Sequence, residues 1–307
     1  MSCKSSTLIY ANTGVGKTVQ CGSWAYAIHQ RTNKKIRYYT AEPGGVETIQ
    51  HLVDAGILEV WDISARPNFT ESVEQASQGY WLDPKDLTKT IAPTAQTWET
   101  VGGLIYEGGT SFGEQLLEEM RVKAANNEIM AVEKPPQQYT SGSLRVAGSG
   151  MAHYGMAQAR VRRAMTQSQR LPAHILWTCR EVKASDEEMV SGYKEIFGPQ
   201  IVGTAMTPHV PSWFGKTVHL HLVKELGVDP VTKKTIEKVV RKAFFKTHFI
   251  DNAKTPYVAN PRLPVEVVDD LPESVTATSL TMSELLDTID SLKAKAREML
   301  KHGGKSV

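Results

Sequence analysis

The chain has 307 residues, of which 41% are hydrophobic and 22% are charged, so it can bury a core in one large domain or two smaller ones. Its formal charge of +2 is too balanced to predict a nucleic-acid partner by itself, and any basic surface must be local. Three cysteines without metal-ligand spacing predict reduced thiols. No apolar run reaches membrane-spanning length and the N-terminus leads straight into a strand, so we expect a cytoplasmic protein without a signal peptide.

The first motif in the chain is a phosphate-binding loop: a small residue, four free positions, then Gly-Lys-Thr. An apolar strand at residues 7–10 leads into the loop, and an amphipathic helix is expected at residues 18–30. Strand, glycine-rich loop and helix therefore follow in the order that nucleotide binding requires. The loop consists of Ala11, Asn12, Thr13, Gly14, Val15, Gly16, Lys17 and Thr18.

The residue types of this loop suit a bound phosphate. Gly14 and Gly16 let successive backbone N–H groups turn inward, and the start of the following helix adds the positive end of its dipole. Lys17 would reach the β and γ phosphates, and the Thr18 hydroxyl would bind Mg²⁺. Because the guanine-reading stretch Asn-Lys-x-Asp is missing from the sequence, ATP is the expected nucleotide.

Strands alternate with helices through the N-terminal half. A β-rich run at residues 35–40 stops at a Pro-Gly-Gly turn just after Glu42, and a further strand is expected at residues 58–63. Residues 66–98 show no clear pattern. Another strand, at residues 101–106, runs into an abrupt turn and a capped helix. This alternation predicts an α/β fold with a mostly parallel sheet flanked by helices.

The second half begins with residues 126–155, which are rich in Gly, Ser and Pro and predict a flexible loop. A helix at residues 156–171 and a core strand at residues 174–178 follow. From residue 217 the alternation of side chains predicts a β-hairpin. We divide the chain into a core at residues 1–264, a linker at 265–280, and a C-terminal amphipathic helix with a basic tail at 281–307.

Two carboxylates could anchor the metal at the end of an apolar strand. Asp62 has the usual residue type but is followed by residues that continue its strand, whereas Glu107 is followed by the turn that would expose a carboxylate at the sheet edge. We prefer Glu107 over Asp62. Glu42, also at a strand end, is the candidate for polarising the attacking water, and a solvated carboxylate without a role is the alternative.

Histidines at alternate positions of the hairpin could also indicate a metal site. His219 and His221 lie two residues apart, and His209 precedes them. No cysteine or carboxylate joins them at ligand spacing, so an exposed face of the hairpin is the preferred interpretation.

The order of these pieces resembles a RecA-type ATPase core, and more narrowly the phage-encoded RecA-like nucleotide-binding proteins. The resemblance is carried by the phosphate loop and by residues 39–42, 153–155, 171–178 and 257–262. It implies an ATPase that acts in the host cytoplasm, with Mg²⁺ as cofactor. It also implies that Glu42 is the catalytic glutamate. Either Thr178 or Arg180 would sense the γ phosphate, since both follow the strand at residues 175–177.

The resemblance further implies partners. RecA-type cores commonly complete their sites across a subunit interface, so the chain is expected to form a homo-oligomer in which Arg241, Lys242 or Lys246 reaches the nucleotide of a neighbour. Charged residues on a solvated hairpin are the alternative.

Some members of the family act with single-stranded DNA. The cations and rings that would contact DNA are Lys134, Tyr139, Arg145 and Tyr154. A different hypothesis is a nucleotide-dependent switch or assembly ATPase, which binds a protein partner through the C-terminal helix and does not touch DNA.

Overall fold

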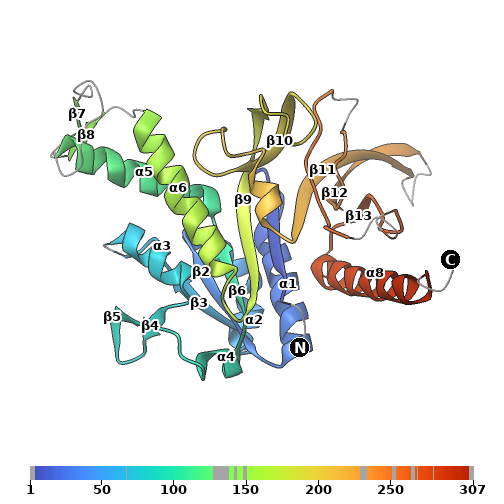
Figure 1. Ribbon diagram of the computed structural model, residues 1–307, viewed down its shortest axis with the longest axis horizontal. Coiled ribbons are helices and arrows are strands. Elements are labelled where there is room, and N and C mark those ends of the chain that lie inside the picture. The colour runs from blue at the N-terminus through green and yellow to red at the C-terminus, as the bar shows by residue number, and fades with distance from the viewer. Residues whose placement is uncertain are drawn as a thin grey trace.

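The computed structural model has an α/β architecture in which one large sheet separates two layers of helices (Figure 1). The structure describes residues 4–66, 68–126, 138–141, 144–147, 151–228, 234–250, 254–263, 267, 269–278 and 280–303.

Most described strands belong to the central sheet, and two short hairpins stand apart from it. The strands are β1 (Ser6–Ala11), β2 (Lys35–Thr40), β3 (Leu58–Asp62), β4 (Trp81–Asp83), β5 (Asp86–Ile91), β6 (Val101–Glu107), β7 (Gln138–Ser141), β8 (Leu144–Ala147), β9 (His174–Ser185), β10 (Glu195–Gln200), β11 (Lys216–Val228), β12 (Thr235–Phe244) and β13 (Ser274–Thr276).

The central sheet has the order β13-β12-β11-β1-β9-β6-β2-β3, and β10 pairs with β9. Neighbouring strands from β11 to β3 are parallel, whereas β12, β13 and β10 join antiparallel. The strand that leads into the phosphate loop, β1, is therefore central, with β9 on one side and β11 on the other. The carboxyl ends of the parallel strands meet at one edge, where open α/β sheets bind their ligands.

Helices cover both faces of this sheet. The α-helices are α1 (Lys17–Thr32), α2 (Gln50–Asp54), α3 (Phe69–Ser77), α4 (Thr97–Thr100), α5 (Gly109–Ala125), α6 (Met151–Ser168) and α8 (Thr281–Gly303), and the 3-10 helices are η1 (Pro43–Ile49) and η2 (Val210–Trp213).

Alternate residues of β1 enter different cores, as expected for a strand covered on both faces. Ile9 packs in a cluster with Trp24 of α1 and Leu286 of α8. Tyr10 packs in a second cluster with Phe112 of α5. Figure 1 shows α6 and α8 on opposite sides of β9.

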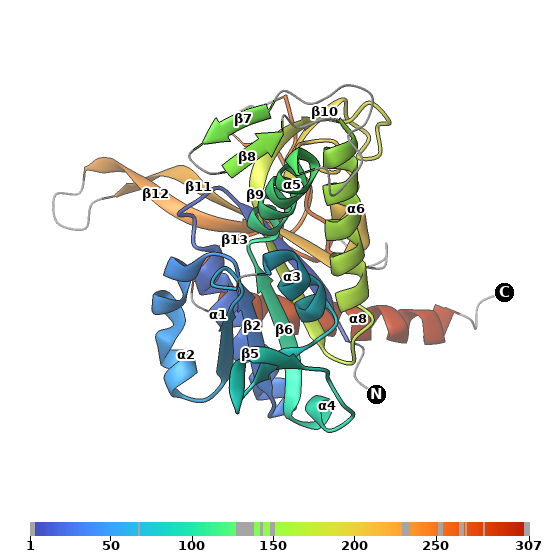
Figure 2. The same ribbon diagram turned by 90° about the vertical axis from the view of Figure 1, so that its left-hand side faces the viewer.

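The predicted fold class is confirmed: a mostly parallel α/β sheet flanked by helices, with a late β-hairpin and a C-terminal helix. The hairpin of β11 and β12 extends away from the body of the molecule (Figure 2). No described helix combines the length and the apolar character that crossing a lipid bilayer demands.

Two segments differ in detail from their sequence interpretation. The stretch expected to be a loop, residues 126–155, contains the β7–β8 hairpin, and α6 begins within it at Met151. The stretch expected to be a linker, residues 265–280, contributes β13 to the edge of the sheet. The apolar stripe of the C-terminal helix is buried in its own chain, because Leu286 and Ile289 are 1% exposed and pack in the cluster that contains α1.

Candidate nucleotide-binding site

The phosphate loop turns sharply between β1 and α1. Gly14 and Gly16 have φ angles of 78° and 98°, a region that other L-residues rarely adopt, and Gly16 caps the N-terminus of α1. The Lys17 Nζ lies 3.1 Å from the carbonyl oxygens of both Ala11 and Asn12, so the ammonium group folds back over the loop. Burial lowers the pKa of Lys17, and the carboxylates of Glu42 and Glu107 oppose that shift. The loop therefore holds a partly desolvated cation where an anion would bind.

Thr18 and Glu107, both expected to bind metal, are brought together by the fold. The Thr18 hydroxyl donates to Glu107 Oε1 at 2.5 Å. Glu107 Oε2 accepts a hydrogen bond from the Tyr38 hydroxyl and lies 3.5 Å from Thr40 Oγ1. The Glu107 residue is 2% exposed, and its burial raises the pKa of the carboxyl group. The carboxylate is thus fixed at the end of β6, beside the first turn of α1.

The donor set fits Mg²⁺, which prefers oxygen ligands. A Cβ added at Gly45 would lie 3.1 Å from Thr18 Oγ1 and 3.3 Å from Glu107 Oε2, so a side chain at this position would crowd both oxygens. Sequence reasoning missed Tyr38 and Gly45. The signal for Tyr38 was available, because Tyr38 and Thr40 lie two positions apart on β2, and Thr40 pairs with Glu107 in the register.

Asp62, the alternative metal anchor, forms hydrogen bonds within the turn that follows its own strand. Its Oδ1 accepts hydrogen bonds from the backbone N–H of Ser64 at 2.9 Å and from the Ser64 hydroxyl at 2.6 Å. Its strand, β3, lies at the end of the sheet and is separated from β1 by β2, β6 and β9. Asp62 therefore stabilises the turn after β3, and Glu107 is the carboxylate that contacts Thr18.

Glu42 belongs to a polar network next to this pair. Its Oε1 accepts a hydrogen bond from the Ser111 hydroxyl at 2.7 Å and lies 3.7 Å from the guanidinium of Arg180. Arg180 also donates to Ser111 at 3.0 Å and to the carboxylate of Glu114 at 3.2 Å. The side chains of Glu42 and Arg180 are 39% and 38% exposed, so water reaches both.

The two candidates for sensing the γ phosphate differ in their surroundings. Thr178 is fully buried, and its Oγ1 accepts a hydrogen bond from the backbone N–H of Gly108 at 3.0 Å. Gly108, with a φ angle of 88°, caps the N-terminus of α5. Thr178 therefore holds the turn that follows Glu107, whereas the partly exposed guanidinium of Arg180 lies among polar side chains.

Of the three late cations, Arg241 lies at the phosphate loop of its own chain. A Cβ added at Gly16 would meet its Cζ and Nε, each at 3.1 Å. The Arg241 Nε is buried without a hydrogen-bond partner among the described residues. Lys242 pairs with Glu225 at 2.5 Å, and the Lys246 Nζ lies 3.4 Å from the carbonyl oxygen of Asp269. From the sequence, these cations were expected either to reach a neighbouring subunit or to lie on a solvated hairpin, and the position of Arg241 at the loop of its own chain was missed.

The residues expected to contact DNA are only partly described. Lys134 lies outside the described residues, and Tyr139 and Arg145 occupy facing strands of the β7–β8 hairpin. The ring of Tyr154 lies near Gly203 and is packed against the core cluster of Phe112. Tyr154 is therefore partly used in packing.

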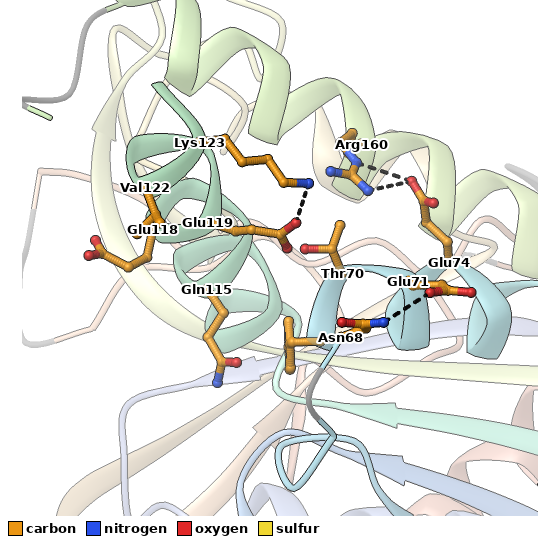
Figure 3. Close-up of a pocket in the computed structure, with 11 residues that line it drawn as sticks. Asn68, Thr70, Glu71, Glu74, Gln115, Glu118, Glu119, Val122, Lys123 and Arg160 are labelled. Carbon is orange, nitrogen blue, oxygen red and sulfur yellow. Dashed lines mark hydrogen bonds and ion pairs between the residues drawn. The ribbon is translucent and has the colours of Figure 1, made fainter. Parts of the chain in front are cut away.

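A separate hollow of about 650 Å³ lies between α3, α5 and α6 (Figure 3). Arg160 of α6 pairs with Glu74 of α3 at 2.8 Å, and Lys123 pairs with Glu119 at 2.6 Å along α5. None of its lining residues belongs to the phosphate loop. This hollow is therefore distinct from the candidate nucleotide site.

No protein-family model matches the sequence, and no curated protein sequence matches it. Solved structures with a related arrangement include a KaiC-like protein from the hyperthermophilic archaeon Pyrococcus horikoshii. The two chains are 9% identical with a TM-score of 0.36, and the similarity covers 84% of this chain and 89% of that one. Because the likeness is so distant, a function has to be inferred from this chain's own residues.

Proposed function

We propose that this chain is a Mg²⁺-dependent ATPase with a RecA-like core. The observation that carries the proposal is the contact between the Thr18 hydroxyl and the Glu107 carboxylate at 2.5 Å, at the start of the helix that follows the phosphate loop. A hydroxyl from that helix and a strand-end carboxylate are the two groups that hold Mg²⁺ in nucleotide-hydrolysing phosphate-loop proteins.

Binding would use the loop and its lysine. The backbone N–H groups around Gly14 and Gly16 and the N-terminus of α1 favour an anion at this point. With phosphates in the loop, the Lys17 ammonium would exchange the carbonyl oxygens of Ala11 and Asn12 for phosphate oxygens. The desolvation that lowers the pKa of Lys17 also strengthens its attraction to a phosphate.

Hydrolysis would divide the work between two carboxylates. Bound Mg²⁺ would supply positive charge to the phosphates, with Thr18 and Glu107 as its protein ligands. Glu42, which is more exposed than Glu107, would orient the attacking water and accept its proton. Ser111 and Arg180 hold the Glu42 carboxylate in place through the contacts described above.

Turnover of ATP by the Lys17→Ala variant tests this function. The variant should fold normally and retain less than about a tenth of the wild-type rate, because removing a charge that stabilises the transition state costs several kcal/mol. The matched control is Lys35→Ala, which removes an exposed lysine paired with Glu59 and should hydrolyse ATP at the wild-type rate. A wild-type rate in Lys17→Ala would overturn the proposal.

We further propose that single-stranded DNA is the effector of this ATPase. The family resemblance motivates this, and a basic groove of about 390 Å³ along α6 supports it. Arg162 and Arg163 line the groove and are exposed, and neither pairs with a carboxylate of a described residue. The Arg162 guanidinium lies 5.4 Å from the ring centre of Trp213. Cations and aromatic rings are the groups that bind the backbone and the unpaired bases of single strands.

A salt titration with an oligonucleotide tests the DNA proposal. Removing both arginines should reduce the slope of log affinity against log salt by about 1.4, since each contact to a single strand contributes about 0.7. Arg121→Ala, which removes an arginine paired with Glu118 on α5, should keep the wild-type slope. If the wild-type protein binds no oligonucleotide at low salt, with or without ATP, DNA is not the effector.

The alternative, an assembly ATPase that binds a protein partner through the C-terminal helix, has less support. The apolar stripe of α8, from Met282 to Ala296, is buried against the body of the chain. The exposed face of α8 that remains for a partner is mostly polar, with Met299 as an exposed apolar side chain.

A further inference from the structure

Three potential metal ligands from two strands, β9 and β11, meet near the end of β1. Tyr10, near that end, pairs in register with Cys179 of β9 and with His219 of β11. Two residues further along, β9 presents Glu181 and β11 presents His221. Because β1 has turned into the phosphate loop, no strand separates these two side chains there.

This arrangement corrects the sequence interpretation of the histidines. His219 is fully buried, and the side chain of His221 is 20% exposed, so the histidines do not line a solvated face. A carboxylate does join them, since the side chain of Glu181 is only 5% exposed and its Oε2 lies 2.6 Å from His219 Nε2. The alternation of residues 217–223 could not reveal Glu181, which is 38 residues away from His219.

The hydrogen bonds behind His219 determine which of its nitrogens carries the proton. The Nδ1 of His248 lies 2.8 Å from the carbonyl oxygen of Lys246, and because a carbonyl can only accept, Nδ1 must donate. The Nε2 of the neutral His248 ring is then an acceptor for His219 Nδ1 at 3.1 Å. Both rings are at most 1% exposed, so their nitrogens depend on partners within the protein.

With Nδ1 of His219 facing His248, its Nε2 faces the carboxylate of Glu181 and can serve as a ligand nitrogen. A ring nitrogen and a carboxylate oxygen 2.6 Å apart need a proton or a metal ion between or beside them. A shared proton would satisfy this pair alone. A third donor, His221 Nδ1, lies 4.0 Å from the same Glu181 oxygen, and one ligand atom from each residue lies within 4.8 Å of the others. This convergence favours a metal ion.

We propose that Glu181, His219 and His221 bind a divalent metal ion of the zinc class. Two imidazole nitrogens and one carboxylate oxygen are a ligand set that Zn²⁺ uses in sites with an open fourth position. Tetrahedral ligands at about 2.05 Å from the ion lie about 3.3 Å apart, so the 2.6 Å separation would widen and the 4.0 Å separation would shorten, each by about 0.7 Å. His248 and the carbonyl of Lys246 orient the ring of His219, as outer partners of metal-binding histidines do.

The site would touch the start of the phosphate loop. The Asn12 Nδ2 donates to Glu181 Oε1 at 3.1 Å, and the carbonyl oxygen of Asn12 accepts from Lys17. A metal ion there would connect β9 to β11 across the end of β1 and fix the side chain of Asn12. This site is separate from the Mg²⁺ position at Thr18 and Glu107, so its existence does not depend on ATP hydrolysis.

Zinc binding to the full-length protein, after treatment with a chelator and in excess Mg²⁺, tests the proposal. The wild-type protein should bind one Zn²⁺ per chain and unfold at a higher temperature with it. His221→Ala, which changes a partly exposed side chain, should bind at least about 100-fold more weakly, more than the usual loss from an outer partner. Glu181→Gln should also lose tight binding. His209→Ala, a histidine near Glu188 on another segment, should bind as the wild type does.

Co²⁺ provides a second measurement, because its visible spectrum reports its ligands directly. The wild-type protein and His209→Ala should give the same visible absorption of four-coordinate Co²⁺, and it should disappear in His221→Ala and in Glu181→Gln. If the wild-type protein binds neither ion stoichiometrically, the pair of Glu181 and His219 shares a proton and the proposal fails. If His221→Ala and Glu181→Gln both bind Zn²⁺ as tightly as the wild type, the metal is elsewhere and the proposal also fails.

Discussion

Glu42 follows the end of β2, and Glu107 is the last residue of the neighbouring strand β6. The surroundings of these two carboxylates differ. Glu107 is 2% exposed and accepts from two hydroxyl groups, while the Glu42 side chain is 39% exposed next to Arg180. A buried, oriented oxygen suits a metal ligand, and a wetter carboxylate suits contact with the attacking water.

The Glu42→Gln variant should bind Mg²⁺ and ATP with wild-type affinity and lose turnover by at least about 100-fold. The amide keeps the shape and can still accept from Ser111, but it cannot take a proton from water. Single-turnover hydrolysis and nucleotide affinity, measured side by side, separate the two effects. Weakened binding with an unchanged rate would show that Glu42 contacts the nucleotide and not the water.

The raised pKa of Glu107 predicts how stability depends on pH. Burial favours the protonated carboxyl in the folded protein, so the stability contributed by this proton is complete below the ordinary glutamate pKa, about 4.3. It is lost as the pH rises through the raised pKa. Without Mg²⁺ or nucleotide, Glu107→Gln should therefore gain stability over the wild type as the pH rises from about 4 to about 8. Urea unfolding at several pH values measures the difference, and a constant difference would contradict the assignment.

At the scale of elements, the hairpin of β11 and β12 places Arg241 next to Gly16 of the phosphate loop. Arg241→Ala should weaken ATP binding by about tenfold or more, because a hydrogen bond from a charged group contributes about 1.5–3 kcal/mol. Lys238→Ala, which changes an exposed cation on the same strand, is the control and should bind ATP normally. Equal affinities in wild type, variant and control would remove Arg241 from the site.

The C-terminal helix α8 is part of the core rather than an appendage. Leu286→Ala should lower the free energy of unfolding by about 2–5 kcal/mol, as expected for a leucine that is 1% exposed. Leu280, just before the helix, is 50% exposed, and Leu280→Ala should change stability by less than about 0.5 kcal/mol. Denaturant unfolding measures both. A silent Leu286→Ala would mean that α8 does not stabilise the folded chain.

Local features of the sequence predicted the elements that depend on neighbours in the chain. The phosphate loop, the parallel strands and the turn after Glu107 all follow from residues within a few positions of one another. The surroundings of His219 did not, because Glu181 and His248 reach it only through the pairing of distant strands. Residues 66–98 were also unpredictable, since β4 and β5 are short and Trp81 is held by rings from β2 and β3.

At the scale of the whole molecule, self-association remains a prediction. Lys246 lies on the surface near Asp269 and would be available to a neighbouring subunit, whereas Arg241 already lies at the loop of its own chain. If Lys246 acts between subunits, specific ATPase activity should rise with protein concentration. Mixing Lys17→Ala with Lys246→Ala subunits should also restore part of the turnover. Concentration-independent activity without rescue would indicate a self-sufficient monomer.

The most direct test of the account is the Mg²⁺-dependence of ATP affinity in Glu107→Gln and Asp62→Asn. If Thr18 and Glu107 hold the metal, wild type and Asp62→Asn should bind ATP more tightly when Mg²⁺ is added. Glu107→Gln should lose most of that gain and bind as the others do without the metal. A wild-type gain in Glu107→Gln together with a loss in Asp62→Asn, or no ATP binding by the wild-type protein, would contradict the account.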